Sequence, residues 1–403
     1  MRRRGGSSCR LVDLGLVSAL GVGSDATWPR LITGDTSRLS WRDDLIAGER
    51  RRFGAVLDTL PEVPSHLSRY ACRNNQLSLA AFSCIEASVQ ATISNFGPER
   101  VGIVAGSSTA GLAEAEEAVR AWKQQGALTP SFDLVQLEYG GVAEFLRQIS
   151  GSLGPCYTIS TACSTGAKAL VSARTLLRLG VCDAVIAGAV DSLCQLTASG
   201  FFALQAISDD TPNPMSRGRD GLILGEGATW FLVTREEGGI QLLGAGESSD
   251  AHHMSAPDPT GRGAEECMRS ALAEPGLDPS SVSYLNLHGT ATPLNDAMES
   301  LAVERVLGRR VACSSTKPLV GHTLGASGAI EAAFCWLVLS RRRGSRLALP
   351  PHRYDGDRDP ELPELNLVGE GTEADAGDEL IVMTNSFGFG GNNCALVMGV
   401  EEP

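Results

Sequence analysis

Cys163 is the residue whose sequence surroundings are best suited to covalent chemistry. Residues 158–170 read TISTACSTGAKAL, so a β-branched strand would enter a turn of small residues and continue into a helix. At the start of a helix, the peptide dipoles and unpaired N–H groups stabilise a thiolate, which is a strong nucleophile. The alternative is a buried structural cysteine, which is the interpretation we favour for the rest of the eleven cysteines.

Two segments that contain histidine follow other predicted strands. His288 opens the segment HGTATPLND directly after an apolar run, and it is one of six histidines. Lys317, one of only three lysines in the chain, lies shortly before His322. Active sites of open α/β sheets collect beyond the carboxyl ends of the strands, so we expect these side chains to meet Cys163 there. The alternatives are a turn-capping role for His288 and separate packing roles for Lys317 and His322.

A glycine-rich segment follows the last predicted strand. Residues 385–393 read NSFGFGGNN, and glycines let N–H groups turn toward a bound anion. The segment lacks the Gly-Lys-Ser/Thr ending of a P-loop, which argues against a nucleotide phosphate. The sequence shows neither a cysteine pair with zinc-site spacing nor a Gly-x-Ser-x-Gly elbow before a helix. We therefore predict neither a metal site nor a serine hydrolase.

Composition excludes several classes of protein. The 403 residues are 43% hydrophobic and 20% charged, which excludes an intrinsically disordered chain. A net charge of −13 without a basic face argues against a nucleic-acid-binding protein. An acidic partner would therefore have to meet a local patch of arginines.

Cysteine usage and hydropathy indicate the compartment. The eleven cysteines form no CxxC pair, and a chain of this size does not need disulfides, so we expect a reducing cytoplasm. The sequence has no apolar run of the length that a membrane span needs, so we predict no membrane span. Asp13 interrupts the apolar stretch that follows the basic start, so we do not expect a signal peptide.

The order of the predicted elements indicates an α/β fold with mostly parallel, buried strands. The predicted strands cover residues 11–20, 101–105, 156–161, 181–187, 240–244, 284–287, 310–314 and 380–384. The predicted helices cover residues 75–95, 112–125, 166–179, 264–273, 296–307 and 326–339, and residues 22–75 are expected to be irregular. A polar stretch near residue 236 divides the chain into two predicted halves, residues 1–235 and 236–403.

In this order, the motifs resemble those of the elongating β-ketoacyl-acyl carrier protein synthases, members of the thiolase superfamily. Besides the segments around Cys163, His288 and Lys317, the resemblance includes residues 213–228 and 248–254 and the glycine-rich segment. It implies an α/β, thiolase-like, five-layered αβαβα fold made of two similar halves, and a dimer. Residues 73–77, RNNQL, resemble synthases of bacterial aryl polyene pathways.

The resemblance also implies a catalytic role for each candidate residue. Cys163, His288 and His322 would form the catalytic triad. Lys317 would order the His322 side of the site and offset nearby carboxylates. The N–H groups of Cys163 and Phe389 would form the oxyanion hole, and Phe389 would gate the acyl pocket.

Further residues would bind substrates or support the site. The resemblance implies that Thr290 and Thr292 hydrogen-bond the pantetheine arm. The supporting charge network would consist of Asp296, Glu299 and Glu331. The candidates for contact with an acidic carrier protein are Arg69, Arg73, Arg217 and Arg219, with a structural role as the alternative for the last. Metal or redox cofactors are not expected, because the substrates would arrive on the phosphopantetheine of acyl carrier protein.

The implied activity is a decarboxylative Claisen condensation. An acyl thioester would acylate Cys163, and malonyl-acyl carrier protein would convert that acyl group to β-ketoacyl-acyl carrier protein, in fatty acid or polyene/polyketide synthesis. The alternatives are a chain-length-factor-like partner subunit with little catalysis and a coenzyme A-dependent thiolase. Homodimer and heterodimer both stay open. Asn392, Asp191 and Lys168 depart from the usual family residues, which leaves the acyl-chain specificity open.

Overall fold

The N-terminal half of the chain builds one α/β sheet. The structure is a computed structural model, which describes residues 9–377 and 380–401. Its main strands in this half are β1 (Arg10–Ser18), β5 (Val101–Gly106), β6 (Cys156–Ile159), β7 (Ala184–Asp191) and β8 (Gly227–Thr234). They lie in the order β6-β5-β7-β8-β1. β5 is parallel to β6 and β7, whereas β8 is antiparallel to β7 and β1.

The C-terminal half repeats this arrangement. Its main strands are β9 (Gly239–Ser249), β10 (Val282–Asn286), β11 (Ala312–Ser314), β15 (Ile381–Gly388) and β16 (Asn392–Glu401). They lie in the order β11-β10-β15-β16-β9, with β10 parallel to β11 and β15, and β16 antiparallel to β15 and β9. Strand order and direction therefore match those of the first half strand by strand, which confirms the predicted two similar halves.

The two sheets join at one point. β1 and β9 pair where Arg10 faces Gln241, so the described strands of both halves form one continuous path. The expected boundary between residues 235 and 236 lies in the turn that joins β8 to β9. This boundary stays a prediction.

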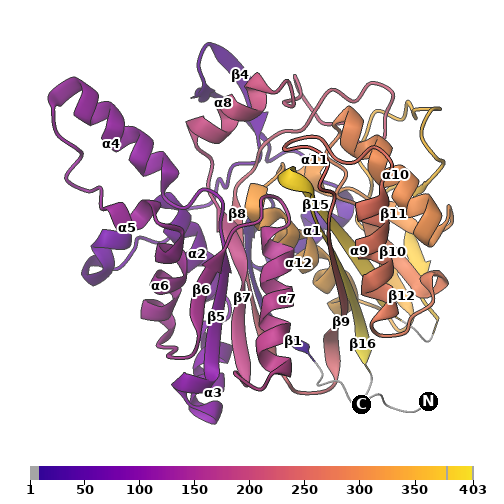
Figure 1. Ribbon diagram of the computed structural model, residues 1–403, viewed down its shortest axis with the longest axis horizontal. Helices are drawn as coiled ribbons and strands as arrows, with labels where there is room; N and C mark the ends of the chain where they lie inside the picture. Colours follow the sequence, from indigo (N-terminus) through magenta and orange to yellow (C-terminus); the bar gives the residue numbers. More distant parts are fainter. Residues whose placement is uncertain (1–8, 378–379, 402–403) are drawn as a thin grey trace.

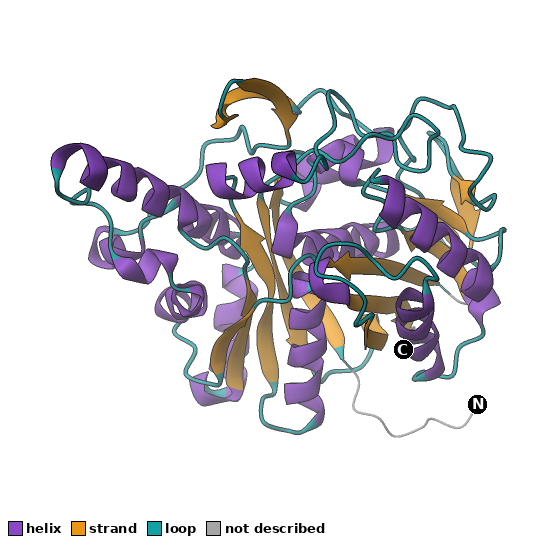
Figure 2. Cartoon of the chain, turned by 45° about the horizontal axis from the view of Figure 1, so that its top comes forward, coloured by secondary structure: helices purple, strands orange, loops and turns teal. Residues whose placement is uncertain are grey.

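Helices separate and cover the two sheets. α7 (Thr165–Arg178) and α12 (Ser327–Ser340) pack against each other between the sheets, as the centre of Figure 1 shows. The outer helices of the N-terminal half are α2 (Arg73–Ser83), α3 (Glu86–Phe96) and α6 (Tyr139–Ser150), and those of the C-terminal half are α9 (Arg262–Ala273) and α10 (Pro293–Leu307). Figure 2 shows helices on both sides of the strands. The layers are thus αβαβα, as expected.

The burial of the central elements explains their sequences. α12 lies between two sheets, and most of its side chains are buried around its whole circumference, which accounts for a sequence that is apolar except for Glu331 and the serines at its ends. Every residue of β7 and β8 is buried, so these strands read as apolar runs without alternation.

The remaining helices and strands are additions to the main elements of the five layers. They include α1 (Ser24–Thr33), α4 (Leu112–Gln125), α5 (Leu134–Leu137), α8 (Gln195–Ala203) and α11 (Lys317–Val320), with α4 projecting from the body at the left of Figure 1. The minor strands are β2 (Gly21–Val22), β3 (Ser40–Ile46), β4 (Glu49–Phe53), β12 (Arg346–Ala348), β13 (Asn366–Leu367) and β14 (Glu373–Asp375). The 3-10 helices are η1 (Ser65–Tyr70), η2 (Pro98–Arg100), η3 (Pro279–Ser281), η4 (Leu324–Ala326) and η5 (Phe389–Gly391).

Two expectations about the first hundred residues are wrong. The segment 22–75 is not irregular, because it contains α1 and the β3–β4 hairpin. The single helix expected over residues 75–95 is two helices, α2 and α3, that meet at 71°. The side chains of Ser83 and Cys84 hydrogen-bond to carbonyls four residues earlier, a contact that bends helices.

Within residues 9–377 and 380–401, no single helix is both long and apolar enough to cross a membrane. Only the sharply bent α2–α3 pair reaches the required length and composition when the two helices are joined.

Glycines set the separation of the two central helices. A Cβ atom on Gly166 of α7 would lie 2.5 Å from the backbone nitrogen of Ala329 on α12. A Cβ atom on Gly328 of α12 would lie 2.8 Å from the nitrogen of Ala167. The helices can therefore approach at this crossing only because neither position carries a side chain.

Substitution of Gly166 tests this packing. We expect Gly166→Ala to lower the free energy of unfolding by about 1–3 kcal/mol, the usual cost of overpacking a core, when unfolding is followed in urea. The matched control is Gly140→Ala in α6, where the new methyl group meets nothing within 4 Å. Because alanine favours helix over glycine, this control should gain up to about 1 kcal/mol. Equal effects of the two substitutions would show that the helices can move apart freely.

Candidate active site

The fold brings Cys163, His288 and His322 to one point. Cys163 follows β6, His288 follows β10, and His322 follows α11 beyond the end of β11. Their sulfur and ring nitrogen atoms all lie within 4.8 Å of one another. All three side chains are buried, and Cys163 is the most exposed of them at 6%. The expected convergence beyond the carboxyl ends of strands is thus present.

A strained turn presents Cys163. Ala162 has a positive φ of 54°, which non-glycine residues rarely adopt. Thr165 holds this turn, because its hydroxyl donates to the carbonyl of Ala162 at 2.6 Å and accepts from the N–H of Thr161 at 2.7 Å. The sulfur therefore sits just before the first turn of α7, near the two histidines.

The ionisation of Cys163 differs from the expected thiolate. Burial raises the pKa of Cys163 to about 11, although Lys317 and the N–H groups of Phe389 and Cys163 lower it in part. The thiol is therefore protonated near neutral pH. His322 Nε2 lies 2.9 Å from the sulfur and is placed to take its proton.

Lys317 contacts the Nδ1 side of the His288 ring, which differs from the position that we expected for it. Its Nζ lies 3.2 Å from His288 Nδ1 and 2.5 Å from Glu331 Oε1, and both Lys317 and Glu331 are 2% exposed. We expected Lys317 to order the His322 side, whereas the polar contacts of its ammonium are on His288 and Glu331. An ammonium only donates hydrogen bonds, so Nδ1 accepts and the ring proton of His288 is on Nε2.

Both histidines are neutral. Burial, followed by the Lys317 charge and His322, holds the pKa of His288 well below its usual range. Burial and then Lys317 do the same to the pKa of His322. Nδ1 of His322 has no hydrogen-bond partner among the described residues, so its tautomer depends on the contact of Nε2 with the Cys163 thiol. The rings meet edge to face, with centroids 5.5 Å apart.

Glu299 fixes the backbone that carries His288. Its carboxylate accepts the N–H groups of His288 at 2.8 Å and Gly289 at 2.7 Å. Burial raises the pKa of Glu299 to about 7. We expected Lys317 to offset both Glu299 and Glu331, but the structure gives it an ion pair with Glu331, while the polar contacts of Glu299 are amides.

Asp296 anchors a neighbouring loop. Its carboxylate accepts the N–H of Met215 at 2.8 Å and a side-chain N–H of Asn295 at 3.2 Å. Burial raises the pKa of Asp296 to about 6. Asp296 thus has the supporting position expected for it.

The N–H groups of Cys163 and Phe389 are near enough to the sulfur to lower the pKa of the thiol. A Cβ atom on Gly388 would lie 3.1 Å from the Cys163 nitrogen, so the absence of a side chain there favours the close approach of the two segments. The role of these two N–H groups as the donors of an oxyanion hole stays a prediction.

A cavity of about 320 Å³ leads to the three side chains. Its walls include Thr290 and Thr292, whose hydroxyl oxygens are 2.9 Å apart, and Phe389. Phe201 of α8 was not predicted, although its ring stacks on Phe389 with centroids 5.4 Å apart and also lines the cavity. The only signal was the pair of adjacent phenylalanines at positions 201 and 202, which is equally typical of a core helix.

Asp191 joins the two halves of the chain. Its buried carboxylate accepts the N–H of Ser108 at 2.7 Å and the N–H of Gly325 at 2.6 Å. Gly325 lies three residues after His322, so this contact ties the His322 loop to the N-terminal half. Of the other two unusual residues, Asn392 donates to the carbonyl of Phe389 at 3.4 Å, and Lys168 lies 3.5 Å from Glu247.

The four arginines predicted to contact a carrier protein differ in their surroundings, and that contact stays a prediction. The guanidinium of Arg73 pairs with buried Glu226 at 2.5 Å and donates to the carbonyl of Val56, so it is not an unpaired surface cation. Arg219 forms a buried ion pair with Asp359, so its structural alternative holds. The side chains of Arg69 and Arg217 are 60% and 63% exposed, and each lies near one carboxylate.

The catalytic cluster could in principle bind a soft metal, because cysteine and histidine are typical ligands. The positive charge of Lys317 lies next to the His288 ring and disfavours the binding of a metal ion there. A cation at the three side chains would have to overcome that repulsion.

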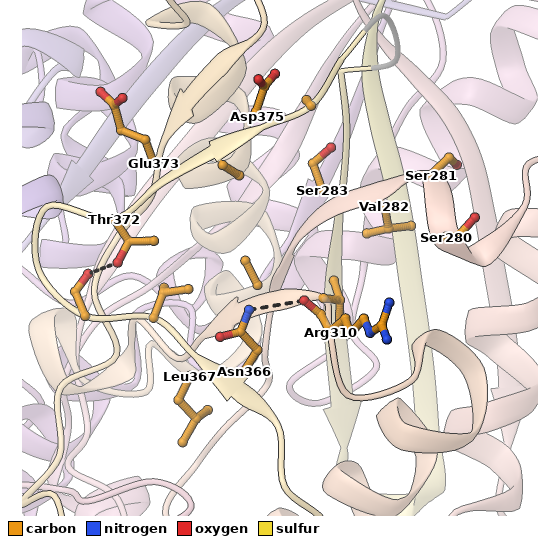
Figure 3. Close-up of a pocket in the computed structure, with 16 residues that line it drawn as sticks. Ser280, Ser281, Val282, Ser283, Arg310, Asn366, Leu367, Thr372, Glu373 and Asp375 are labelled. Atoms are coloured by element: carbon orange, nitrogen blue, oxygen red, sulfur yellow. Dashed lines mark hydrogen bonds between the residues drawn. The ribbon is translucent and has the colours of Figure 1, made fainter.

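A second cavity, about 630 Å³, lies at the amino ends of β10 and β11 (Figure 3). Ser280, Ser283, Arg310, Asn366 and Thr372 are among its lining residues, and Asn366 donates to the carbonyl of Arg310 at 3.1 Å. Cysteine and histidine are absent from its described lining. Its lining carries serine and threonine hydroxyl groups and the carboxylates of Glu373 and Asp375, and it includes none of the three side chains that converge at Cys163.

Comparison with known proteins matches both halves to one family. The family model described as "Beta-ketoacyl synthase, N-terminal domain" matches residues 12–238, and "Beta-ketoacyl synthase, C-terminal domain" matches residues 240–346. The 3-oxoacyl-(acyl-carrier-protein) synthase 2 of Rhizobium meliloti (strain 1021) is 32% identical and covers 96% of this chain and 97% of that protein. The enzyme of the same name from Staphylococcus aureus is 30% identical, with 96% and 99% covered.

Solved structures agree with this match. The structure "Ketosynthase (ApeO) in Complex with its Chain Length Factor (ApeC) from Xenorhabdus doucetiae" has a TM-score of 0.92, 38% identity and 98% coverage of both chains. A β-ketoacyl synthase from Burkholderia phymatum STM815 has a TM-score of 0.83 and 26% identity, with 98% and 100% covered. The resemblance drawn from the motifs is confirmed, and the chain belongs to the beta-ketoacyl synthase family.

Proposed function

We propose that this protein is a condensing enzyme that joins an acyl group on Cys163 to malonyl-acyl carrier protein with loss of CO₂. One observation carries the proposal: a buried thiol lies 2.9 Å from one neutral imidazole, beside a second imidazole that Lys317 holds in its Nε2–H form. The first group supplies a nucleophile with its base, and the second supplies a fixed hydrogen-bond donor. A cavity connects them to the surface.

In the first half-reaction, Cys163 is acylated. As the sulfur attacks the thioester carbonyl, its proton passes to His322 Nε2. The N–H groups of Cys163 and Phe389 would hold the tetrahedral oxyanion. The C–S bond to the carrier then breaks, and the departing thiolate takes the proton back from His322.

In the second half-reaction, malonyl-acyl carrier protein loses CO₂ to give an enolate. His288 Nε2–H donates to the thioester oxygen as negative charge develops there. His322 becomes a second donor in the tautomer with its proton on Nε2, which is accessible because its Nδ1 is unpartnered among the described residues. One such donor contributes roughly 3–4 kcal/mol in other enzymes. The enolate carbon attacks the acyl-Cys163 carbonyl, the C–S bond breaks, and the thiolate is reprotonated by a proton from solvent that passes through His322.

The reaction would need no resident metal or redox cofactor, because these side chains supply the nucleophile, the proton acceptor and the oxyanion donors. Both substrates would enter on the phosphopantetheine of acyl carrier protein, with Thr290 and Thr292 along its path. Arg69 and Arg217 stay candidates for contact with that carrier.

We also propose the setting in which the enzyme works. The relatives titled as a ketosynthase with its chain length factor support a partner of the same fold, with a homodimer as the alternative. A chain-length-factor-like role for this chain itself is disfavoured, because Cys163 is present with its histidines. All eleven cysteines lie in the described part of the chain and are unpaired, which supports a reducing cytoplasm.

Substitution of His288 tests whether acylation and decarboxylation depend on different side chains. In His288→Ala, self-acylation of Cys163 should continue, while decarboxylation of malonyl-acyl carrier protein should fall by about a hundredfold or more, as when an oxyanion donor is lost. Intact-protein mass spectrometry measures the acyl adduct, and ¹⁴CO₂ release measures decarboxylation. Cys163→Ala is the control and should form no adduct. Full decarboxylation by His288→Ala would refute the role of the Lys317–His288 pair.

The pH dependence of alkylation tests the resting state of Cys163. Because burial raises the pKa of Cys163 to about 11, the thiolate fraction should keep rising with pH through the neutral range. We expect the rate of iodoacetamide modification of Cys163, followed by peptide mass spectrometry, to increase about tenfold per pH unit between about pH 6.5 and 9. A rate that reaches a plateau below neutral pH would instead indicate a preformed thiolate.

A further inference from the structure

His352 is a buried histidine that the proposed mechanism does not use. It lies beyond β12, between Pro351 and Arg353, and it does not line the catalytic cavity in the described structure. It is only 6% exposed, and the ring of Tyr354 packs against it with centroids 5.1 Å apart. Its sequence surroundings gave no reason to select it.

Both ring nitrogens of His352 bind backbone groups of other segments. Nδ1 accepts the N–H of Ser315 at 3.1 Å, and Nε2 lies 2.9 Å from the carbonyl oxygen of Pro214. An amide N–H only donates and a carbonyl only accepts, so the ring is neutral with its proton on Nε2. Burial supports this state, since it lowers the pKa of His352 to about 4.

The Ser315 contact leads directly to the catalytic pair. The Ser315 hydroxyl donates to the carbonyl of Gly289 at 2.7 Å and accepts the N–H of Lys317 at 3.3 Å. A Cβ atom on Gly289 would lie 2.5 Å from the Cβ of Ser315, so the backbone after His288 rests closely on this serine. Ser315 thus touches both segments whose side chains meet at Lys317 Nζ and His288 Nδ1.

The Pro214 contact reaches a different part of the site. The next residue, Met215, has a positive φ of 63°, and its N–H binds Asp296 at the start of α10. The same loop continues to Gly221, whose N–H donates to the carbonyl of Ala291 at 3.0 Å. The Pro214 contact therefore ties His352 to the segment 214–221, which hydrogen-bonds to Asp296 and Ala291 in the segment that follows His288.

We propose that His352 is a positioning residue that fixes the Ser315 segment and thereby holds Lys317 against His288. This inference rests on the proposed function, since it assigns His352 to the decarboxylation half-reaction. Acylation depends on Cys163 and His322, which His352 does not contact in the described structure. His352 should therefore matter for one half-reaction and not for the other.

Two amide substitutions separate the two contacts of the ring. The side-chain oxygen of His352→Asn can replace Nδ1 as the acceptor for Ser315, whereas the longer amide of His352→Gln can replace Nε2 as the donor to Pro214. We expect His352→Gln to lower ¹⁴CO₂ release from malonyl-acyl carrier protein by about tenfold to a hundredfold, the cost of a displaced catalytic group. His352→Asn should retain most of the activity, and both variants should acylate Cys163 at the rate of the unsubstituted protein.

The acylation measurement also shows that each variant is folded, and His66→Asn, at an exposed histidine, is the control for loss of an imidazole. Equal decarboxylation by the Asn and Gln variants would overturn the proposal, as would loss of both half-reactions together, which indicates a merely structural role. If the unsubstituted protein neither acylates nor decarboxylates, the proposed function itself fails and this inference with it. If the unsubstituted protein is active and His352→Gln loses nothing, only the assignment of His352 fails.

Discussion

The active site depends on one buried ammonium group. Lys317 is 2% exposed, and a charge removed from water to this extent needs a close partner of opposite sign. Glu331 provides that partner from α12, and another hydrogen of Nζ is donated to His288 Nδ1. Burial and then the lysine charge keep His288 neutral, and the lysine sets its tautomer. A guanidinium would not fit the same role, because its planar fork could not act as a compact charge between a carboxylate and a ring nitrogen.

The duplicated fold explains why side chains so distant in sequence converge. β6 leads into α7 in the first half, and β11 leads through α11 into α12 in the second half. Cys163 and His322 both lie just before the central helix of their own half. Since α7 and α12 pack against each other between the sheets, these two segments must come together. The helix crossing at Gly166 and Gly328 is therefore part of the active-site geometry and also of the core.

Much of this arrangement could be predicted from the sequence. The segments around Cys163 and His288 could be selected because residues that can do chemistry follow apolar runs there. The helix expected at residues 112–125 has those bounds in the structure. β8 and β16 were missed, because the glycines and small residues near their ends weaken the strand pattern. The α2–α3 bend was missed because it contains neither proline nor glycine.

The wrong expectations about the site have one common cause, which is that the sequence does not show which side chains pair in the fold. Lys317 is close to His322 in sequence, yet the short helix α11 turns its side chain toward His288 and Glu331. Arg73 reads as an available surface cation until Glu226, 153 residues away, is found beside it. Spacing along the chain identifies which residues carry chemistry, whereas only the folded arrangement decides which of them pair and which protonation state burial imposes.

The most direct test of the account is the tautomer of His288. In protein labelled with ¹⁵N-histidine, the His288 signals, assigned by comparison with His288→Asn, should report a neutral ring with its proton on Nε2. Because burial and Lys317 hold the pKa of His288 well below its usual range, these signals should not titrate near about pH 6.5, where an ordinary histidine does. A neutral ring with its proton on Nδ1, or an imidazolium that forms near that pH, would contradict the central claim that Lys317 fixes the donor of the decarboxylation step.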